Sequence, residues 1–219
     1  MQEIVPDVLV WSRFSERHGY DFNSHLVVRH PDGNLCIDPV EPGDGTLDEL
    51  AKIGATRVLL TNRNHSRSAN LLRTRLGART AIHPNDADYA RSQGAEIDDA
   101  LEAGARIGPL QVVGVPGKSP GEVAFFWSER KLLIVGDAVI GNPPGQCGLL
   151  PEKVIDDPVR LQEGIVKLFE CLWRSRCEWT GWRKMLADCV FQAAAAVMIW
   201  FQTAKRLVIS VRHSGALIR

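Results

Sequence analysis

The stretch Leu59-Leu-Thr-Asn-Arg-Asn-His-Ser-Arg-Ser68 decides how the rest of the chain is interpreted. It starts with the end of a short apolar strand, Arg57–Leu60, and continues into a polar loop that leads to a helix. A loop of this kind at the end of a strand is typical of a metal-binding site. However, asparagine, serine and arginine occupy most of the positions where metal ligands are expected.

The segments around this loop alternate between strands and helices as far as residue 82, after which a β-meander is predicted. Periodicity and turn residues predict strands over Ile4–Ser12, His25–Arg29, Asn34–Ile37, Arg57–Leu60, Thr80–Ile82, Leu110–Val113, Val123–Trp127 and Lys131–Val135. Helices are predicted from a capping box at Thr46–Glu49 to Gly54, around Leu71–Leu76 before Gly77, over Asn85–Ser92, and over Val159–Cys171 after Pro158.

Four short motifs resemble those of the metallo-β-lactamase superfamily, and the resemblance covers roughly residues 4–170. They are Asn23-Ser-His-Leu26, Leu59-Leu-Thr61, Val115-Pro-Gly-Lys-Ser-Pro-Gly121 and Val135-Gly-Asp137. The resemblance implies an α/β fold, namely an αβ/βα sandwich of two mixed β-sheets flanked by helices. It also implies one or two metal ions, mostly zinc, and hydrolysis of esters, thioesters, amides or phosphodiesters.

The family's ligands are largely replaced in this chain. The ligand positions of the family's T-H-x-H-x-D-H loop and TPGHTPG turn fall on Asn62, Asn64, Ser66, Arg67 and Lys118, while the metal-bridging aspartate is kept as Asp137. Zinc prefers imidazole, thiolate or carboxylate ligands. Arginine has no lone pair to offer, and a nearby cation repels a metal ion. We therefore predict that no catalytic zinc is bound and that no other cofactor replaces it.

Two interpretations of the altered pocket remain open. In the first, Asp137 pairs with Lys118 or Arg67 and the charges hold the loops closed, giving a non-hydrolytic binding module or an inactive one. In the second, Arg67 and Lys118 bind a small anionic molecule together with Asn62, Asn64 and Asp137. An active hydrolase with an atypical or metal-free site is the alternative function, with Asp137 or His65 as its candidate general base.

His65 lies one residue out of step with the ligand positions, so a histidine bonded locally within the polar loop is the simplest interpretation. His18, His25, His30 and His213 lack partners at metal-site spacing and are interpreted as surface or structural residues.

The composition changes near Cys171, which separates a domain of residues 1–170 from a tail of residues 171–219. The tail holds eight of the 26 basic residues but two of the 26 acidic ones, and four of the six tryptophans. It lacks the strand and histidine turn that end the family's domain, so the C-terminal end is abnormal. A shifted reading frame and a genuine extension are both consistent with it. The apolar run within 190–204 is shorter than the roughly 20 residues that a membrane span needs.

The bulk composition restricts the partners and the compartment. The formal net charge is zero, which gives no indication of a nucleic-acid or membrane partner. Five cysteines without a CxxC pair favour free thiols, and no signal peptide is recognisable, so we expect a cytoplasmic protein.

Overall fold

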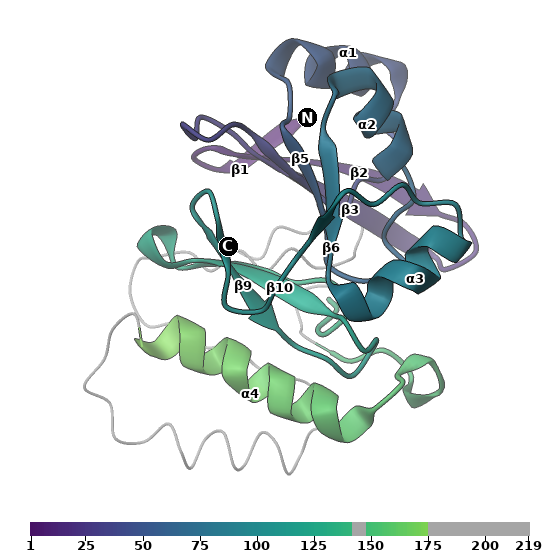
Figure 1. Cartoon of the computed structure of the whole chain (residues 1–219), viewed down its shortest axis with the longest axis vertical. Helices are drawn as coiled ribbons and strands as arrows, with labels where there is room; N and C mark the ends of the chain where they lie inside the picture. Colours follow the sequence, from purple (N-terminus) through teal and green to yellow (C-terminus); the bar gives the residue numbers. More distant parts are fainter. Residues whose placement is uncertain (142–147, 175–219) are drawn as a thin grey trace.

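The computed structural model describes residues 1–141 and 148–174, and for residues 172–174 the backbone alone. Two β-sheets lie face to face, with helices on both outer faces (Figure 1). This is the αβ/βα sandwich that the sequence predicted. No helix in the described part of the chain is both long enough and apolar enough to cross a bilayer. The first four residues of the predicted tail, 171–174, are helical, and the rest of the tail, including the run at 190–204, lies outside the described residues.

The larger sheet has seven strands in the order β1-β2-β3-β4-β5-β6-β7. Its strands are β1 (Gln2–Val5), β2 (Val8–Ser15), β3 (Tyr20–Val27), β4 (Leu35–Ile37), β5 (Arg57–Leu60), β6 (Arg79–Ile82) and β7 (Asp99–Ala100). The strands from β1 to β4 pair antiparallel, and those from β4 to β7 pair parallel. The carboxyl ends of β4, β5 and β6 therefore open at one edge of the sheet.

The smaller sheet is fully antiparallel, in the order β11-β10-β9-β8, as the predicted meander requires. Its strands are β8 (Arg106–Ile107), β9 (Leu110–Gly114), β10 (Val123–Trp127) and β11 (Leu132–Ile134). The α-helices are α1 (Asp44–Ile53), α2 (Ala69–Leu76), α3 (Pro84–Ser92) and α4 (Pro158–Arg174). Two short 3₁₀ turns, η1 (Ser128–Arg130) and η2 (Glu152–Val154), complete the described elements.

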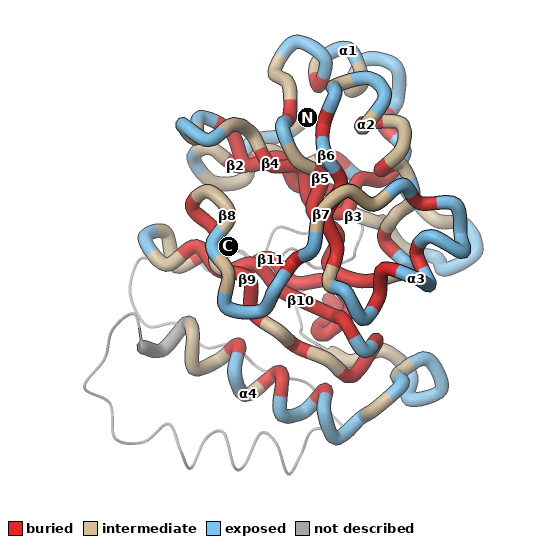
Figure 2. The backbone as a smooth tube through the Cα atoms, in the orientation of Figure 1, coloured by how far each residue is buried: buried red, intermediate tan, exposed pale blue. Residues whose placement is uncertain are grey.

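Three apolar layers separate the two sheets from each other and from the helices. Leu60 and Leu72 belong to the layer between the larger sheet and α1 to α3, whereas Leu59 and Phe125 belong to the layer between the sheets. Phe126 and Leu161 lie in the third layer, below α4. Because side chains alternate along a strand, one continuous apolar run fills a layer on each of its faces. Figure 2 shows the resulting buried centre with exposed helix surfaces.

Several predicted boundaries are wrong. The strand predicted over His25–Arg29 is β3, which begins five residues earlier at Tyr20 because Tyr20 to Ser24 pair with β2, and which ends at Val27. The predicted strand Ile4–Ser12 is two strands, because the chain turns between them and Asp7 adopts a left-handed φ of 66°. The predicted capping box at Thr46 does not begin α1. That helix starts at Asp44 after Gly43, and an acid in its first turn suits the helix dipole.

Candidate functional site

Polar residues gather where β4, β5 and β11 end. Asp38 follows β4, Thr61 follows β5, and Asp137 follows β11 after Gly136. Gly136 approaches the β5 loop so closely that an added Cβ would lie 2.3 Å from Thr61 Oγ1. A glycine is therefore needed at this position to bring the two sheets' loops together.

Asp38 is the anchor of the β5 loop, and the sequence analysis did not identify it. Its backbone adopts a left-handed φ of 50°, and its carboxylate accepts hydrogen bonds from Thr61 N at 2.8 Å and Thr61 Oγ1 at 2.6 Å. His65 Nδ1 lies 2.9 Å from Asp38 Oδ2. Burial opposes ionisation, but the charge of His65 and the hydrogen bonds from His65 and Thr61 lower the pKa of Asp38 overall.

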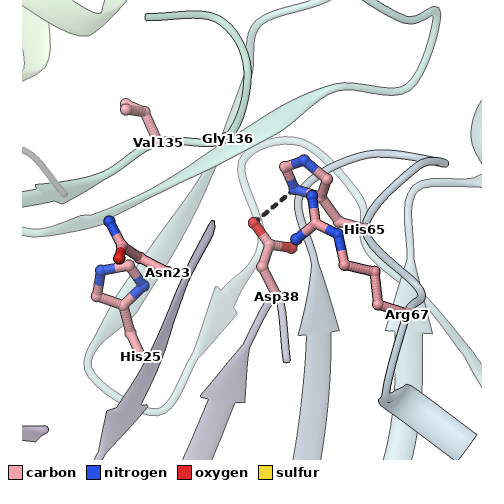
Figure 3. A pocket seen from close by; sticks show the side chains of 7 residues that line it. All are labelled: Asn23, His25, Asp38, His65, Arg67, Val135 and Gly136. Carbon is pink, nitrogen blue, oxygen red and sulfur yellow. Dashed lines mark hydrogen bonds and ion pairs between the residues drawn. The ribbon is translucent and has the colours of Figure 1, made fainter. Parts of the chain in front are cut away.

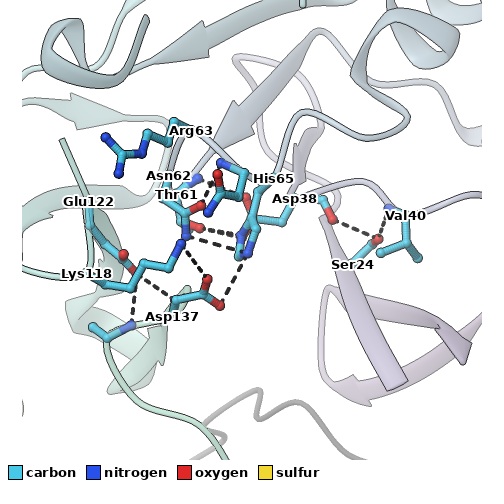
Figure 4. A network of polar contacts seen from close by, with 12 residues as sticks. Ser24, Asp38, Val40, Thr61, Asn62, Arg63, His65, Lys118, Glu122 and Asp137 are labelled. Carbon is cyan, nitrogen blue, oxygen red and sulfur yellow. Dashed lines mark hydrogen bonds and ion pairs between the residues drawn. The ribbon is translucent and has the colours of Figure 1, made fainter. Parts of the chain in front are cut away.

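His65 occupies the centre of the polar network rather than bonding only within its loop, as the sequence analysis expected. Its Nδ1 faces Asp38, and its Nε2 lies 3.3 Å from Asp137 Oδ1 (Figure 4). The ring is buried, with 3% of its residue surface exposed. Both ring nitrogens are therefore directed at carboxylates, which leaves neither of them open toward solvent.

Lys118 pairs with Asp137, the aspartate at the position that the family resemblance assigns to metal bridging. Its Nζ lies 3.2 Å from Asp137 Oδ2, and the two side chains are 6% and 3% exposed. The structure thus contains one of the two Asp137 pairings that the first interpretation anticipated. Because both side chains are buried, the attraction between the two charges is stronger than in an exposed ion pair, and removing one partner would destabilise the fold.

Glu122 lies behind this ion pair and was also missed. Its Oε1 accepts hydrogen bonds from Asp137 N at 2.5 Å and Ala138 N at 2.8 Å, so it fixes the loop that carries Asp137. Burial, followed by the charge of Asp137, raises the pKa of Glu122 well above its ordinary value, although Lys118 acts in the opposite direction. Glu122 is therefore harder to ionise than an ordinary glutamate.

Asp86 on α3 is a further carboxylate, and it fixes the neighbouring loops. It accepts hydrogen bonds from Arg63 N at 2.9 Å, Ser119 Oγ at 2.5 Å and Gly121 N at 2.8 Å. The Arg63 side chain turns away from Asp137 and pairs with Asp156 at 2.6 Å. Arg63 therefore holds the loop from outside the polar network.

The predicted binding residues are separated by the fold. Asn62 is buried, and its Nδ2 lies 3.5 Å from His65 Nε2, whereas Asn64 is exposed. Arg67 is also exposed, and its guanidinium carbon lies 4.2 Å from the centre of the Phe22 ring. Of the five predicted residues, Asn62, Lys118 and Asp137 meet in the network through their side chains. The Asn64 backbone N–H donates to Asn62 Oδ1 at 2.9 Å, and Arg67 lines the adjoining pocket.

A small pocket opens beside the network. It is lined by Asn23, His25, Asp38, His65, Arg67, Val135 and Gly136 (Figure 3). His25, which the sequence analysis treated as surface or structural, is buried on β3 and forms one wall of this pocket. Its signal in the sequence was its position in an alternating strand, two residues before the apolar Val27.

The residues at the family's metal position do not fit a dication. No group of three or more His, Cys, Asp or Glu side chains in the described residues is arranged to hold a metal ion. His65 Nδ1 already bonds Asp38, and the Lys118 ammonium lies against the carboxylate that a metal would need. An ammonium at this distance would repel a metal ion strongly in a buried setting.

Comparison with known proteins agrees with the fold. The family model described as "Metallo-beta-lactamase superfamily" matches residues 2–169. The chain belongs to the metallo-β-lactamase superfamily. It is a divergent member of that superfamily, since most of the family's ligand positions carry other residues.

The individual relatives of this superfamily member are distant. Two hydroxyacylglutathione hydrolases, from Synechococcus sp. strains JA-3-3Ab and JA-2-3B'a(2-13), are 28% and 25% identical over 154 residues. The match covers 64% of this chain and 59% of each relative, so the chain spans about three fifths of their length.

Two solved structures illustrate the structural likeness. TTHA1623, crystallised in a di-iron-bound form, is 26% identical with a TM-score of 0.52, and the match covers 68% of this chain and 81% of that one. The metallo-β-lactamase IND-7 is 17% identical with a TM-score of 0.65 over 87% of this chain and 96% of that one, which shows a shared fold.

Proposed function

We propose that this metallo-β-lactamase-fold protein is a non-hydrolytic binding module rather than a zinc-dependent hydrolase. The observation that carries the proposal is the buried Lys118–Asp137 ion pair, at 3.2 Å. In this arrangement a lysine ammonium compensates the carboxylate that would bridge metals in the family. The metal's role of neutralising Asp137 is then filled by the protein itself.

The balance of charges in the network supports this proposal. Asp38 and Asp137 are the two carboxylates that face His65, and Lys118 supplies a fixed positive charge beside Asp137. Burial and the nearby Asp137 raise the pKa of Glu122, which opposes a further negative charge in the network. The Lys118 ammonium thus supplies, within the protein, a positive charge that a metal ion would supply elsewhere in the family.

Elemental analysis tests this proposal directly. The full chain is purified without chelator from zinc-supplemented cells, and we expect far less than one equivalent of metal. The matched variant restores the family's ligands with Asn62→His, Asn64→His, Ser66→Asp, Arg67→His and Lys118→His, and it is expected to gain zinc. About one equivalent of zinc, iron or manganese in the unmodified protein would refute the proposal.

A metal-free or atypical hydrolase is the second candidate, favoured by the similarity to the two hydroxyacylglutathione hydrolases. His65, directed at Asp137, is its candidate general base. Hydrolysis of a hydroxyacylglutathione thioester by chelator-treated protein, lost in both Asp137→Asn and Asp137→Ala, would support this candidate over the binding module. Equal background rates in all three proteins would exclude it for that substrate.

A further inference from the structure

We propose that the pocket between His25 and Arg67 binds the carboxylate group of a small organic acid. This inference rests on the proposed function, because it names the ligand class of a module that lacks a hydrolytic metal. It also moves the anion site that the sequence suggested, since Lys118 is engaged with Asp137 and only Arg67 reaches the pocket.

The first support is an unsatisfied imidazole on the pocket wall. His25 is 3% exposed, and neither of its ring nitrogens has a hydrogen-bond partner in the described structure. Burial lowers the pKa of His25 to about 4, with Asp38 acting in the opposite direction, so the ring is neutral near pH 7. An unpaired buried polar group destabilises the folded protein, and a polar occupant of the pocket would remove this penalty.

The second support is the charge distribution around the pocket. Figure 3 shows Asn23 and His25 on one side, opposite Asp38, His65 and Arg67. The carboxylate of Asp38 already accepts three hydrogen bonds, from Thr61 N, Thr61 Oγ1 and His65 Nδ1. These bonds satisfy its acceptor atoms but leave its negative charge, which the Arg67 guanidinium in the same pocket lining must offset for an anion to bind.

Arg67 provides the positive charge at the rim. Its guanidinium lies over the Phe22 ring, which restricts the side chain while leaving the residue exposed. The planar guanidinium matches the two oxygens of a carboxylate, and such charge-assisted bonds are stronger than neutral ones. A ligand carboxylate could thus meet Arg67 at the rim and a His25 N–H inside.

The size of the pocket selects among anions. Its free volume is about 20 Å³, and a single water already requires roughly 10–15 Å³. This space suits the two oxygens of a planar carboxylate better than the four of a phosphate. The remainder of the acid must extend outward past the rim.

Binding can be measured on the chelator-treated full chain, with acetate replacing chloride at constant ionic strength. We expect a saturable rise in melting temperature and a saturable shift of the His25 ring signals in NMR spectra. Acetamide, which has the same shape without the charge, should give neither effect, and phosphate should act more weakly than acetate.

Variants identify the site. Arg67→Gln should weaken acetate binding at least about tenfold, because it removes the charge-assisted bonds between the guanidinium and the carboxylate. His25→Leu should also weaken it. The matched control is Arg63→Gln, because this arginine of the same loop pairs with Asp156 outside the pocket and should leave acetate binding unchanged.

Several outcomes would overturn the inference: no saturable acetate effect, an equal effect of acetamide, stronger binding of phosphate, or unchanged binding in Arg67→Gln. These results are separate from those that test the proposed function. Metal content is measured before chelation and reports on the hydrolytic centre, whereas acetate binding is measured after chelation and reports on this pocket.

Discussion

Replacing Lys118 by methionine should destabilise the protein severely. Methionine keeps most of the side-chain volume but removes the ammonium that lies 3.2 Å from Asp137 Oδ2. Both side chains are nearly inaccessible to water, so Asp137 would be left as an incompletely compensated buried charge. Breaking a buried ion pair in this way costs about 3–5 kcal/mol, a large part of the roughly 5–15 kcal/mol that stabilises a typical domain.

Urea unfolding, followed by the fluorescence of the buried Trp11 and Trp127, measures this loss. The double variant Lys118→Met with Asp137→Asn separates the ion pair from packing, because it removes both charges together. We expect it to be more stable than Lys118→Met alone. If Lys118→Met costs under about 1 kcal/mol, as for an exposed pair, the reasoning about a dry internal ion pair is wrong.

Three further changes test other parts of the network. The free energy of unfolding should fall by about 3 kcal/mol as the pH drops from 6.5 to about 4, because His25 is then protonated in the unfolded chain but not in the folded one. The same acid titration of the His25→Leu variant should lack this loss of stability. Glu122, whose pKa is raised in the folded state, contributes stability below about pH 4.5 that is lost as the pH rises through its folded pKa. Between about pH 4.5 and the folded pKa of Glu122, the stability of Glu122→Gln should therefore rise relative to that of the unmodified protein by up to about 1.4 kcal/mol per pH unit. Urea unfolding at several pH values measures this difference. Gly136→Ala should lower stability by about 1–3 kcal/mol, because its Cβ would meet Thr61 Oγ1 at 2.3 Å. A thermal melt can compare it with Gly45→Ala in α1, where nothing lies within 4 Å and a small gain is expected.

The regular elements were predictable because their signals are local. The apolar run Arg57–Leu60 is a strand with the predicted bounds, and the helix before Gly77 ends at that residue with a left-handed φ of 68°. The boundary errors at Asp7 and Asp44 arose where a turn or an uncapped helix start leaves no strong sequence pattern. The family motifs then supplied the order of the layers.

The candidate site was predictable only in part. Lys118 and Asp137 were recognised through motifs, but Asp38, Glu122 and His25 act through contacts between strands that are far apart in the sequence. A weak signal existed for each of them, and that of His25 was its position two residues before Val27 in an alternating strand. Asp38 directly follows the apolar strand Leu35–Ile37, and Glu122 directly precedes the apolar run Val123–Trp127.

The exposure of Arg67 could not be inferred from the sequence either. Its position in the family pattern placed it among the metal ligands, whereas its guanidinium lies over Phe22 from β3. Stacking on an aromatic ring at the surface is favourable for an arginine, whereas burial beside Lys118 would place two cations together.

The Lys118–Asp137 ion pair also limits the evolutionary paths open to this protein. Exchanging Lys118 for a neutral ligand removes an internal cation before any metal ion can take its place, so that first step lowers stability. Adding histidines at Asn62 or Asn64 first gains nothing while the ammonium still repels a metal. A return to the family's ligand set by single mutations thus passes through unfavourable intermediates. The Lys118–Asp137 ion pair therefore favours retention of the present residues.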